Sequence, residues 1–120
     1  MDLVLVVDQD RAALQTFGLA CLERGVGVAM AETLCEGVRV LLSRRASLVV
    51  VDVALLRLTP PEIATLFERV APGVPVIVVV HPDTPLETRV GFELLGFQIL
   101  TRPVVVEDLI EKETIGAVTA

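Results

Sequence analysis

Large aromatic side chains are scarce in this sequence: tryptophan and tyrosine are absent, and phenylalanine occurs only four times in 120 residues. Proteins that bind single-stranded nucleic acid commonly stack the bases on aromatic side chains, so the chain lacks the means for that mode of binding. Its formal net charge of −6 would also repel a phosphate backbone. We therefore expect no direct binding of nucleic acid.

Cysteines and long apolar runs are also few. The two cysteines, Cys21 and Cys35, form no CxxC pair and are too few for a disulfide framework, so we interpret both as small core residues in a reducing compartment. Mean hydropathy is high at +0.72. The valine-rich runs are nevertheless far shorter than the roughly 20 residues that a membrane-spanning helix needs. With no signal-peptide pattern at the start, the sequence predicts a cytoplasmic protein without a membrane segment.

The sequence does contain a regular alternation of two apolar patterns. Short apolar runs predict strands at 3–7, 26–31, 48–53, 76–80 and 97–101. The valine-rich runs among them are typical of strands that are buried on both faces. Between them, apolar residues recur at helical spacing. The predicted buried stripes are Leu14, Phe17, Cys21 and Leu22; Leu34, Val38, Leu41 and Leu42; Ile63, Leu66, Phe67 and Val70; and Leu86, Val90 and Leu94. A weaker helical pattern covers 106–118.

Helix start signals support this alternation. Asp10, Thr33, Thr59 and Thr84 each stand at a predicted N-cap, and the last two precede proline. Strands that alternate with helices predict an α/β fold, here a (βα)5 doubly wound parallel sheet in the order 2-1-3-4-5, with residues 1–120 as a single domain. In such sheets, functional residues gather at the carboxyl ends of the strands.

Ionisable side chains stand at four of those predicted strand ends. Asp8 and Asp10 follow the first strand, and Asp52 lies near the end of the third. His81 follows the fourth strand, and Arg102 follows the fifth. Purely structural roles are open for several of them: Asp10 as a helix cap, His81 in a turn, and Arg102 as an ion-pair partner of the acids. A carboxylate inside an apolar strand, such as Asp52, is costly unless it is paired, binds a cation or reaches a crevice.

This combination of residues indicates chemistry with a hard cation and a phosphoryl group. Carboxylates that lie close together repel, and a divalent ion that prefers oxygen ligands, such as Mg²⁺, relieves the repulsion. A basic residue opposite would balance the charge of an added phosphoryl group. An aspartate can itself attack phosphorus to give an acyl phosphate.

The same segments resemble the receiver domains of two-component response regulators over essentially the whole chain. The resemblance rests on Leu-Val-Leu-Val-Val-Asp at 3–8, Leu-Val-Val-Val-Asp at 48–52, the valine-rich segment 74–80 and Leu-Thr-Arg-Pro at 100–103. It implies a flavodoxin-like receiver fold in which a histidine kinase phosphorylates Asp52. It also implies Mg²⁺ binding by Asp8, Asp52 and, weakly, Gln9, with Arg102 and His81 in contact with the phosphoryl group.

Four positions depart from the pattern of this family. Gln9 stands where a second metal-binding carboxylate is expected, and its amide oxygen brings no charge, so the affinity for Mg²⁺ should fall. His81 replaces a Thr or Ser, and Ile99 replaces an aromatic switch residue. Arg102 replaces a Lys, which exchanges a compact ammonium for a planar fork. We interpret the chain as an atypical receiver.

Three functions remain open on these residues. The first is a phosphorylatable receiver that uses Asp52. The second is a pseudo-receiver, a phosphorylation-independent protein–protein interaction module in which Arg102 pairs with Asp52 or Asp8. The third is an unrelated nucleotide- or flavin-binding domain of the same architecture, which the lack of a glycine-rich loop after the first strand disfavours. We do not expect an enzyme.

The expected partners are proteins. The resemblance implies a histidine kinase or another signalling protein, together with a homodimer formed through the fourth helix, the fifth strand and the last helix. Apolar residues in these segments supply the predicted contact surface: Val90, Phe92, Leu95, Val104 and Val105.

Overall fold

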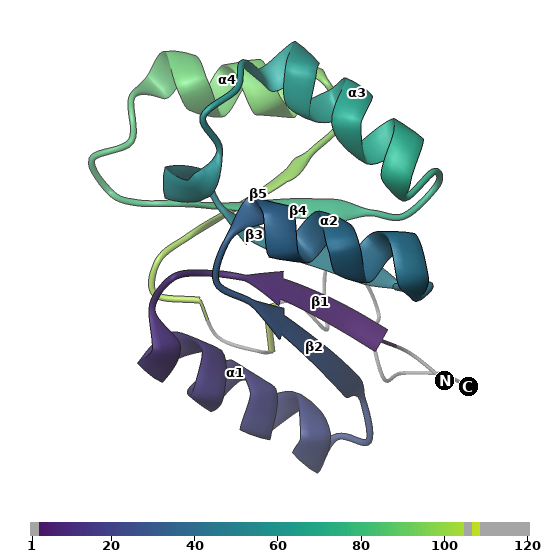
Figure 1. Cartoon of the computed structure of the whole chain (residues 1–120). Coiled ribbons are helices and arrows are strands. Elements are labelled where there is room, and N and C mark those ends of the chain that lie inside the picture. The colour runs from purple at the N-terminus through teal and green to yellow at the C-terminus, as the bar shows by residue number, and fades with distance from the viewer. Residues whose placement is uncertain (1–2, 105–106, 109–120) are drawn as a thin grey trace.

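Five parallel strands form one central sheet. The computed structural model describes residues 3–104 and 107–108. Its strands are β1 (Leu3–Val7), β2 (Gly27–Ala31), β3 (Leu48–Asp52), β4 (Val76–Val80) and β5 (Gln98–Thr101). They lie side by side in the order β2-β1-β3-β4-β5, and every neighbouring pair is parallel (Figure 1). The predicted α/β architecture and strand order are therefore confirmed.

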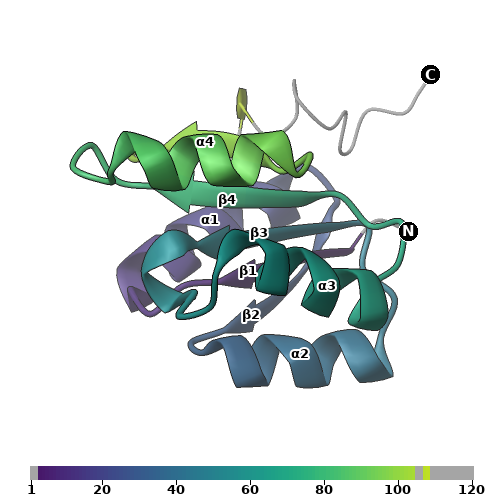
Figure 2. The same cartoon turned by 90° about the horizontal axis from the view of Figure 1, so that it is seen from above.

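Helices cover both faces of the sheet. Helix α1 (Arg11–Glu23) packs on one face, while α2 (Leu34–Ser43), α3 (Pro60–Val70) and α4 (Leu86–Leu94) pack on the other (Figure 2). A single 3-10 turn, η1 (Val53–Leu55), follows β3. Of the helix predicted over 106–118, only residues 107 and 108 lie within the described ranges. None of the helices in those ranges is long and apolar enough to cross a membrane.

The central strands supply two separate cores. All residues of β1, β3 and β4 are buried, as expected for strands with helices on both faces. Alternate side chains point to opposite faces: Val4 and Val6 join the core under α1, while Leu5 and Val7 join the core under α2 and α3. This continuous burial holds the carboxyl ends of three strands in a fixed arrangement.

Three of the four predicted helix caps are confirmed. The side chain of Asp10 accepts hydrogen bonds from two backbone amides in the first turn of α1. The hydroxyl of Thr33 accepts from an amide in the first turn of α2. Thr59 and Glu62 form a reciprocal capping box at the start of α3, with prolines in the first turn.

The prediction that Thr84 caps a helix is wrong. Helix α4 begins after Pro85 and has no side-chain cap. The Thr84 hydroxyl instead accepts a hydrogen bond of 2.9 Å from the backbone amide of His81. The loop after β4 thus uses the threonine to hold its own backbone, so the side chain is not available to the helix.

The predicted buried stripes hold for most of the first three helices and fail for the fourth. In α1 and α2 only the last member of each stripe, Leu22 and Leu42, is exposed. In α4 all three predicted core residues are exposed: Leu86, Val90 and Leu94. The buried residue of α4 is Phe92. The helix approaches α3 so closely at Gly91 that a Cβ there would lie 3.2 Å from a ring carbon of Pro60, and the next residue, Phe92, is buried in the core under α2 and α3.

The interpretation of the cysteines is half right. Cys21 is buried in the core under α1, and burial raises the pKa of its thiol although the nearby charge of Arg24 opposes the shift. Cys35 is exposed on α2, so the prediction that it is a core residue is wrong. The stripe of α2 that faces the sheet runs through Gly37 and Leu41, and Cys35 does not lie on it.

Candidate functional site at the carboxyl ends of the strands

Four charged or polar side chains meet at one edge of the sheet. Asp8 directly follows β1, Asp52 is the last residue of β3, His81 follows β4 and Arg102 follows β5. The backbone continues the sheet pairing at this edge, because the Arg102 amide donates to the Val80 carbonyl at 2.9 Å. The predicted convergence of these residues is thus observed in the fold.

Asp52 occupies the centre of the cluster. It is 4% exposed, and both carboxylate oxygens are engaged. Oδ1 accepts a hydrogen bond of 2.7 Å from the Ala54 amide, and Nε2 of His81 lies 3.0 Å from Oδ1 and 3.1 Å from Oδ2. Oδ2 accepts from Nε of Arg102 at 2.9 Å and from Nη2 at 2.6 Å.

These contacts keep Asp52 ionised. Burial by itself raises the pKa of the Asp52 carboxyl. The hydrogen bonds from Ala54, His81 and Arg102, together with the positive charge of Arg102, outweigh burial and bring this pKa below its usual value. The carboxylate is therefore the stable form of Asp52 at neutral pH.

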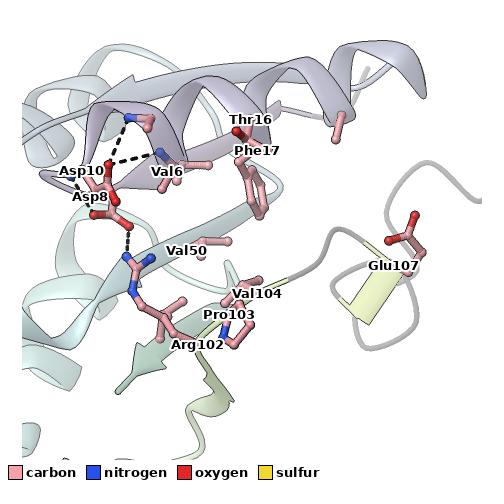
Figure 3. A pocket seen from close by; sticks show the side chains of 14 residues that line it. Val6, Asp8, Asp10, Thr16, Phe17, Val50, Arg102, Pro103, Val104 and Glu107 are labelled. Carbon is pink, nitrogen blue, oxygen red and sulfur yellow. Dashed lines mark hydrogen bonds and ion pairs between the residues drawn. The ribbon is translucent and has the colours of Figure 1, made fainter. Parts of the chain in front are cut away.

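Arg102 joins Asp52 to Asp8. Its Nη2 donates to Oδ2 of Asp52 and also to Oδ2 of Asp8, so a single guanidinium bridges the two buried acids. Figure 3 shows the contact with Asp8. The other oxygen of Asp8 accepts a hydrogen bond of 3.0 Å from the Asp10 amide. Burial disfavours the charge on Arg102, but its hydrogen bonds with the two acids and their negative charges raise its pKa. The peptide bond to Pro103 is cis.

Two residues that sequence analysis did not assign to the site hold His81 in position. The Thr84 hydroxyl accepts from the His81 amide, and Nη2 of Arg89 donates to the His81 carbonyl at 3.1 Å. A threonine three residues after His81, where its hydroxyl can bond to the local backbone, was the available signal for the first contact. The spacing between Arg89 and His81 gave no comparable signal.

The remaining predicted site residues lie apart from this cluster. Asp10 is exposed, and its carboxylate is used to cap α1. Gln9 is exposed next to Asp8. Ile99 is partly buried against the core under α2 and α3, on the next strand from His81. Their positions leave Asp8, Asp52, His81 and Arg102 as the groups that touch one another.

The cluster as it stands does not fit a divalent cation. Mg²⁺ needs near-octahedral oxygen ligands, and Asp8 and Asp52 are the acids that would supply them. A guanidinium lies between these two acids and donates to an oxygen of each. Within residues 3–104 and 107–108, no group of three or more His, Cys, Asp or Glu side chains is arranged to hold a metal ion.

A pocket of about 470 Å³ borders the ion pair on the α1 side (Figure 3). Much of its wall is apolar, including Phe17, Val50 and Val104. Its ionisable lining residues are Asp8, Asp10, Arg102 and Glu107. Three carboxylates against one guanidinium disfavour an anionic ligand, so this pocket is not suited to the phosphates of a nucleotide.

Comparison with known proteins identifies relatives that match most of the length of this chain. No protein-family model matches the chain. The transcriptional regulatory protein GlrR of Escherichia coli K12 is 32% identical over 105 residues, which make up 84% of this chain and 23% of GlrR. The chain therefore spans less than a quarter of the length of this relative.

Solved structures of receiver domains have the same fold. A CheY-like receiver domain protein from Methanospirillum hungatei is 26% identical, with a TM-score of 0.80, and the match covers 93% of this chain and 90% of that one. A response regulator from Burkholderia pseudomallei, solved with a phosphorylated aspartic acid, a calcium ion and citrate, is 21% identical. Its TM-score is 0.80, and the match covers 94% of this chain and 66% of that one. Together with the strand order and the strand-end cluster, these relatives show that the chain belongs to the receiver domains of two-component response regulators.

Proposed function

We propose that this receiver domain acts as a protein–protein interaction module that does not depend on phosphorylation. The observation that carries the proposal is the bridge that Arg102 makes between Asp8 and Asp52. This bridge neutralises part of the charge of the two acids without any added ligand. The surface around it is then set by the fold itself, and a partner can recognise it in the unmodified protein.

The state of Asp52 supports this proposal. For Asp52 to attack phosphorus, one of its oxygens must be free to approach the donor, yet the residue is 4% exposed. Freeing Oδ2 breaks two hydrogen bonds to Arg102, and freeing Oδ1 breaks the bond to the Ala54 amide. Separating a buried ion pair leaves uncompensated charges and is unfavourable. The resting geometry therefore opposes phosphoryl transfer.

A second candidate function is acceptance of a phosphoryl group on Asp52 from a histidine kinase. Its support is the ionised carboxylate, with N–H groups of Arg102 and the Nε2 atom of His81 within hydrogen-bond distance of the oxygens. In this reaction an oxygen of Asp52 forms the new bond to phosphorus while the bond from phosphorus to the donor breaks. Arg102 and His81 would then donate to the phosphoryl oxygens.

Incubation with acetyl phosphate and Mg²⁺, followed by intact-mass analysis, distinguishes the two functions. We expect no gain of a phosphoryl mass, because both oxygens of Asp52 are already engaged. An Asp52→Ala variant is the matched control, and a receiver known to react with acetyl phosphate shows that the donor is active. A phosphoryl mass in the wild type that is missing from Asp52→Ala would overturn the first proposal and establish the second.

The partners we propose are a histidine kinase or another signalling protein, and a second copy of the domain. The dimer surface predicted from the sequence needs revision, because Phe92 is part of the core and Val104 packs against the core under α1. Val105 lies outside the described residues. Exposed apolar side chains on α4 and just after it remain available for contact between two copies: Leu86, Val90, Leu94 and Leu95.

Replacing Leu94 by glutamate should abolish self-association. The side chain is 81% exposed, so a charge there leaves the fold intact but would be buried unpaired in a symmetric contact between two α4 helices. Light scattering after size exclusion should give the mass of a dimer for the wild type and of a monomer for Leu94→Glu. A matched Leu42→Glu variant, exposed on α2, should remain a dimer. A wild type that is monomeric at every concentration would refute the proposed dimer.

A further inference from the structure

We infer that the guanidinium of Arg102 takes the place of a divalent cation at Asp8 and Asp52, so that the folded domain does not bind Mg²⁺ there. This inference deepens the proposed function and rests on its account of the site. Figure 3 shows Asp8 and Arg102 pointing toward each other across the edge of the sheet. The argument has three parts: the charge, the oxygen atoms that are engaged, and the shape of the guanidinium.

The first part concerns the negative charges of Asp8 and Asp52. Two carboxylates that are both buried repel each other, and a positive charge between them relieves the repulsion. Arg102 supplies that charge from within the chain and is bonded to both acids. A Mg²⁺ ion in the same place would lie against the guanidinium, and the repulsion between the two cations would oppose its binding.

The second part concerns the oxygen atoms themselves. Oδ2 of Asp8 and Oδ2 of Asp52 both accept from the same nitrogen, Nη2 of Arg102. The remaining oxygens accept from backbone amides: Oδ1 of Asp8 from Asp10, and Oδ1 of Asp52 from Ala54. All four carboxylate oxygens thus have a donor from the protein. A cation would have to displace Arg102 before it could take a ligand from each acid.

The third part is that an arginine is suited to this role. The planar guanidinium carries five N–H donors in a fixed fork, so it can contact two carboxylates at once. In this site Nε and Nη2 both reach Asp52 while Nη2 also reaches Asp8. A lysine has a compact ammonium at the end of a flexible stem and no such fork. The Arg at this position therefore bridges the two acids with one rigid group.

Titration with MgCl₂, followed by amide signals in nuclear magnetic resonance spectra, tests the inference on the folded protein. For the wild type we expect no saturable shift at the ends of β1 and β3, with NaCl at matched ionic strength as the control for screening. For Arg102→Ala we expect saturable shifts and Mg²⁺ binding that is at least about a hundredfold tighter, because the opposing charge is gone. Adding Asp8→Asn to Arg102→Ala should remove this gain.

Either of two results would overturn the inference. One is saturable Mg²⁺ binding by the wild type at Asp8 and Asp52. The other is a folded Arg102→Ala variant that binds Mg²⁺ no better than the wild type. If Arg102→Ala does not fold, the wild-type titration and Arg102→Gln, which keeps a long side chain without the charge, decide the question. Phosphorylation of Asp52 without Mg²⁺ would contradict the proposed function but leave this inference standing.

Discussion

The Arg102→Ala variant is expected to lose about 3 kcal/mol of the free energy of unfolding, the lower end of the range for breaking a buried ion pair. The substitution leaves Asp8 and Asp52, both buried, without the cation that bridges them. We take the lower end because Arg102 itself is only partly buried, and water can enter where its side chain was. Urea unfolding followed by circular dichroism, extrapolated linearly to water, measures the loss.

A surface ion pair provides the matched control for this prediction. Arg11 pairs with Glu32 at 3.1 Å, but the arginine side chain is 79% exposed. Arg11→Ala should cost less than about 1 kcal/mol, since exposed pairs contribute little. Adding Asp8→Asn to Arg102→Ala should recover part of the loss, because it removes one of the two unpaired charges. Equal losses for Arg11→Ala and Arg102→Ala would contradict the view that Arg102 neutralises buried charge.

The meeting of the site residues was predictable because it depends mainly on topology. Once the sheet order is known, the ends of β1, β3, β4 and β5 must lie near one another, and so must the residues that follow them. The cost of a carboxylate in an apolar strand also indicated that Asp52 needs a partner. Both inferences use only the backbone path and the residue type, which a sequence pattern supplies.

The choice of partner within the cluster was not predictable in the same way. The sequence left open whether Arg102 pairs with Asp52 or Asp8, and the structure shows that it contacts both. That result depends on the distance between Asp8 and Asp52, which lie at the ends of the neighbouring strands β1 and β3, and on how far the Arg102 side chain extends. The role of Thr84 was missed for a related reason: its hydroxyl suits either a helix cap or a turn, and the loop after β4 decides between them.

The orientation of α4 shows a limit of apolar periodicity as a guide to burial. The helix carries apolar residues on more than one face. The spacing of Leu86, Val90 and Leu94 is that of a buried stripe, but spacing alone does not tell which apolar face is in the core. The structure places Gly91 close to Pro60 of α3, where a Cβ would lie 3.2 Å from a ring carbon. A contact of this kind depends on how two helices pack against each other. The apolar periodicity of a single helix carries no information about that packing.

Alanine substitutions on the two faces of α4 should therefore have very different effects. Phe92 is 2% exposed, and its ring packs edge-on against Phe97 with 5.4 Å between the ring centroids. Phe92→Ala removes this contact and leaves a cavity in the core, so it should cost about 3–5 kcal/mol of unfolding free energy. Leu94→Ala removes a side chain that is 81% exposed and should change stability by less than about 0.5 kcal/mol.

Urea unfolding of both variants, at a protein concentration low enough to exclude self-association, measures the difference. Both substitutions introduce alanine into the same helix, and the gain in helix propensity is less than about 1 kcal/mol in each case, too small to hide the loss of a buried ring. The comparison therefore reports which face of α4 is in the core. A larger loss for Leu94→Ala than for Phe92→Ala would mean that the helix is turned as its apolar spacing predicts. In that case the surface proposed for contact between two copies would be part of the core.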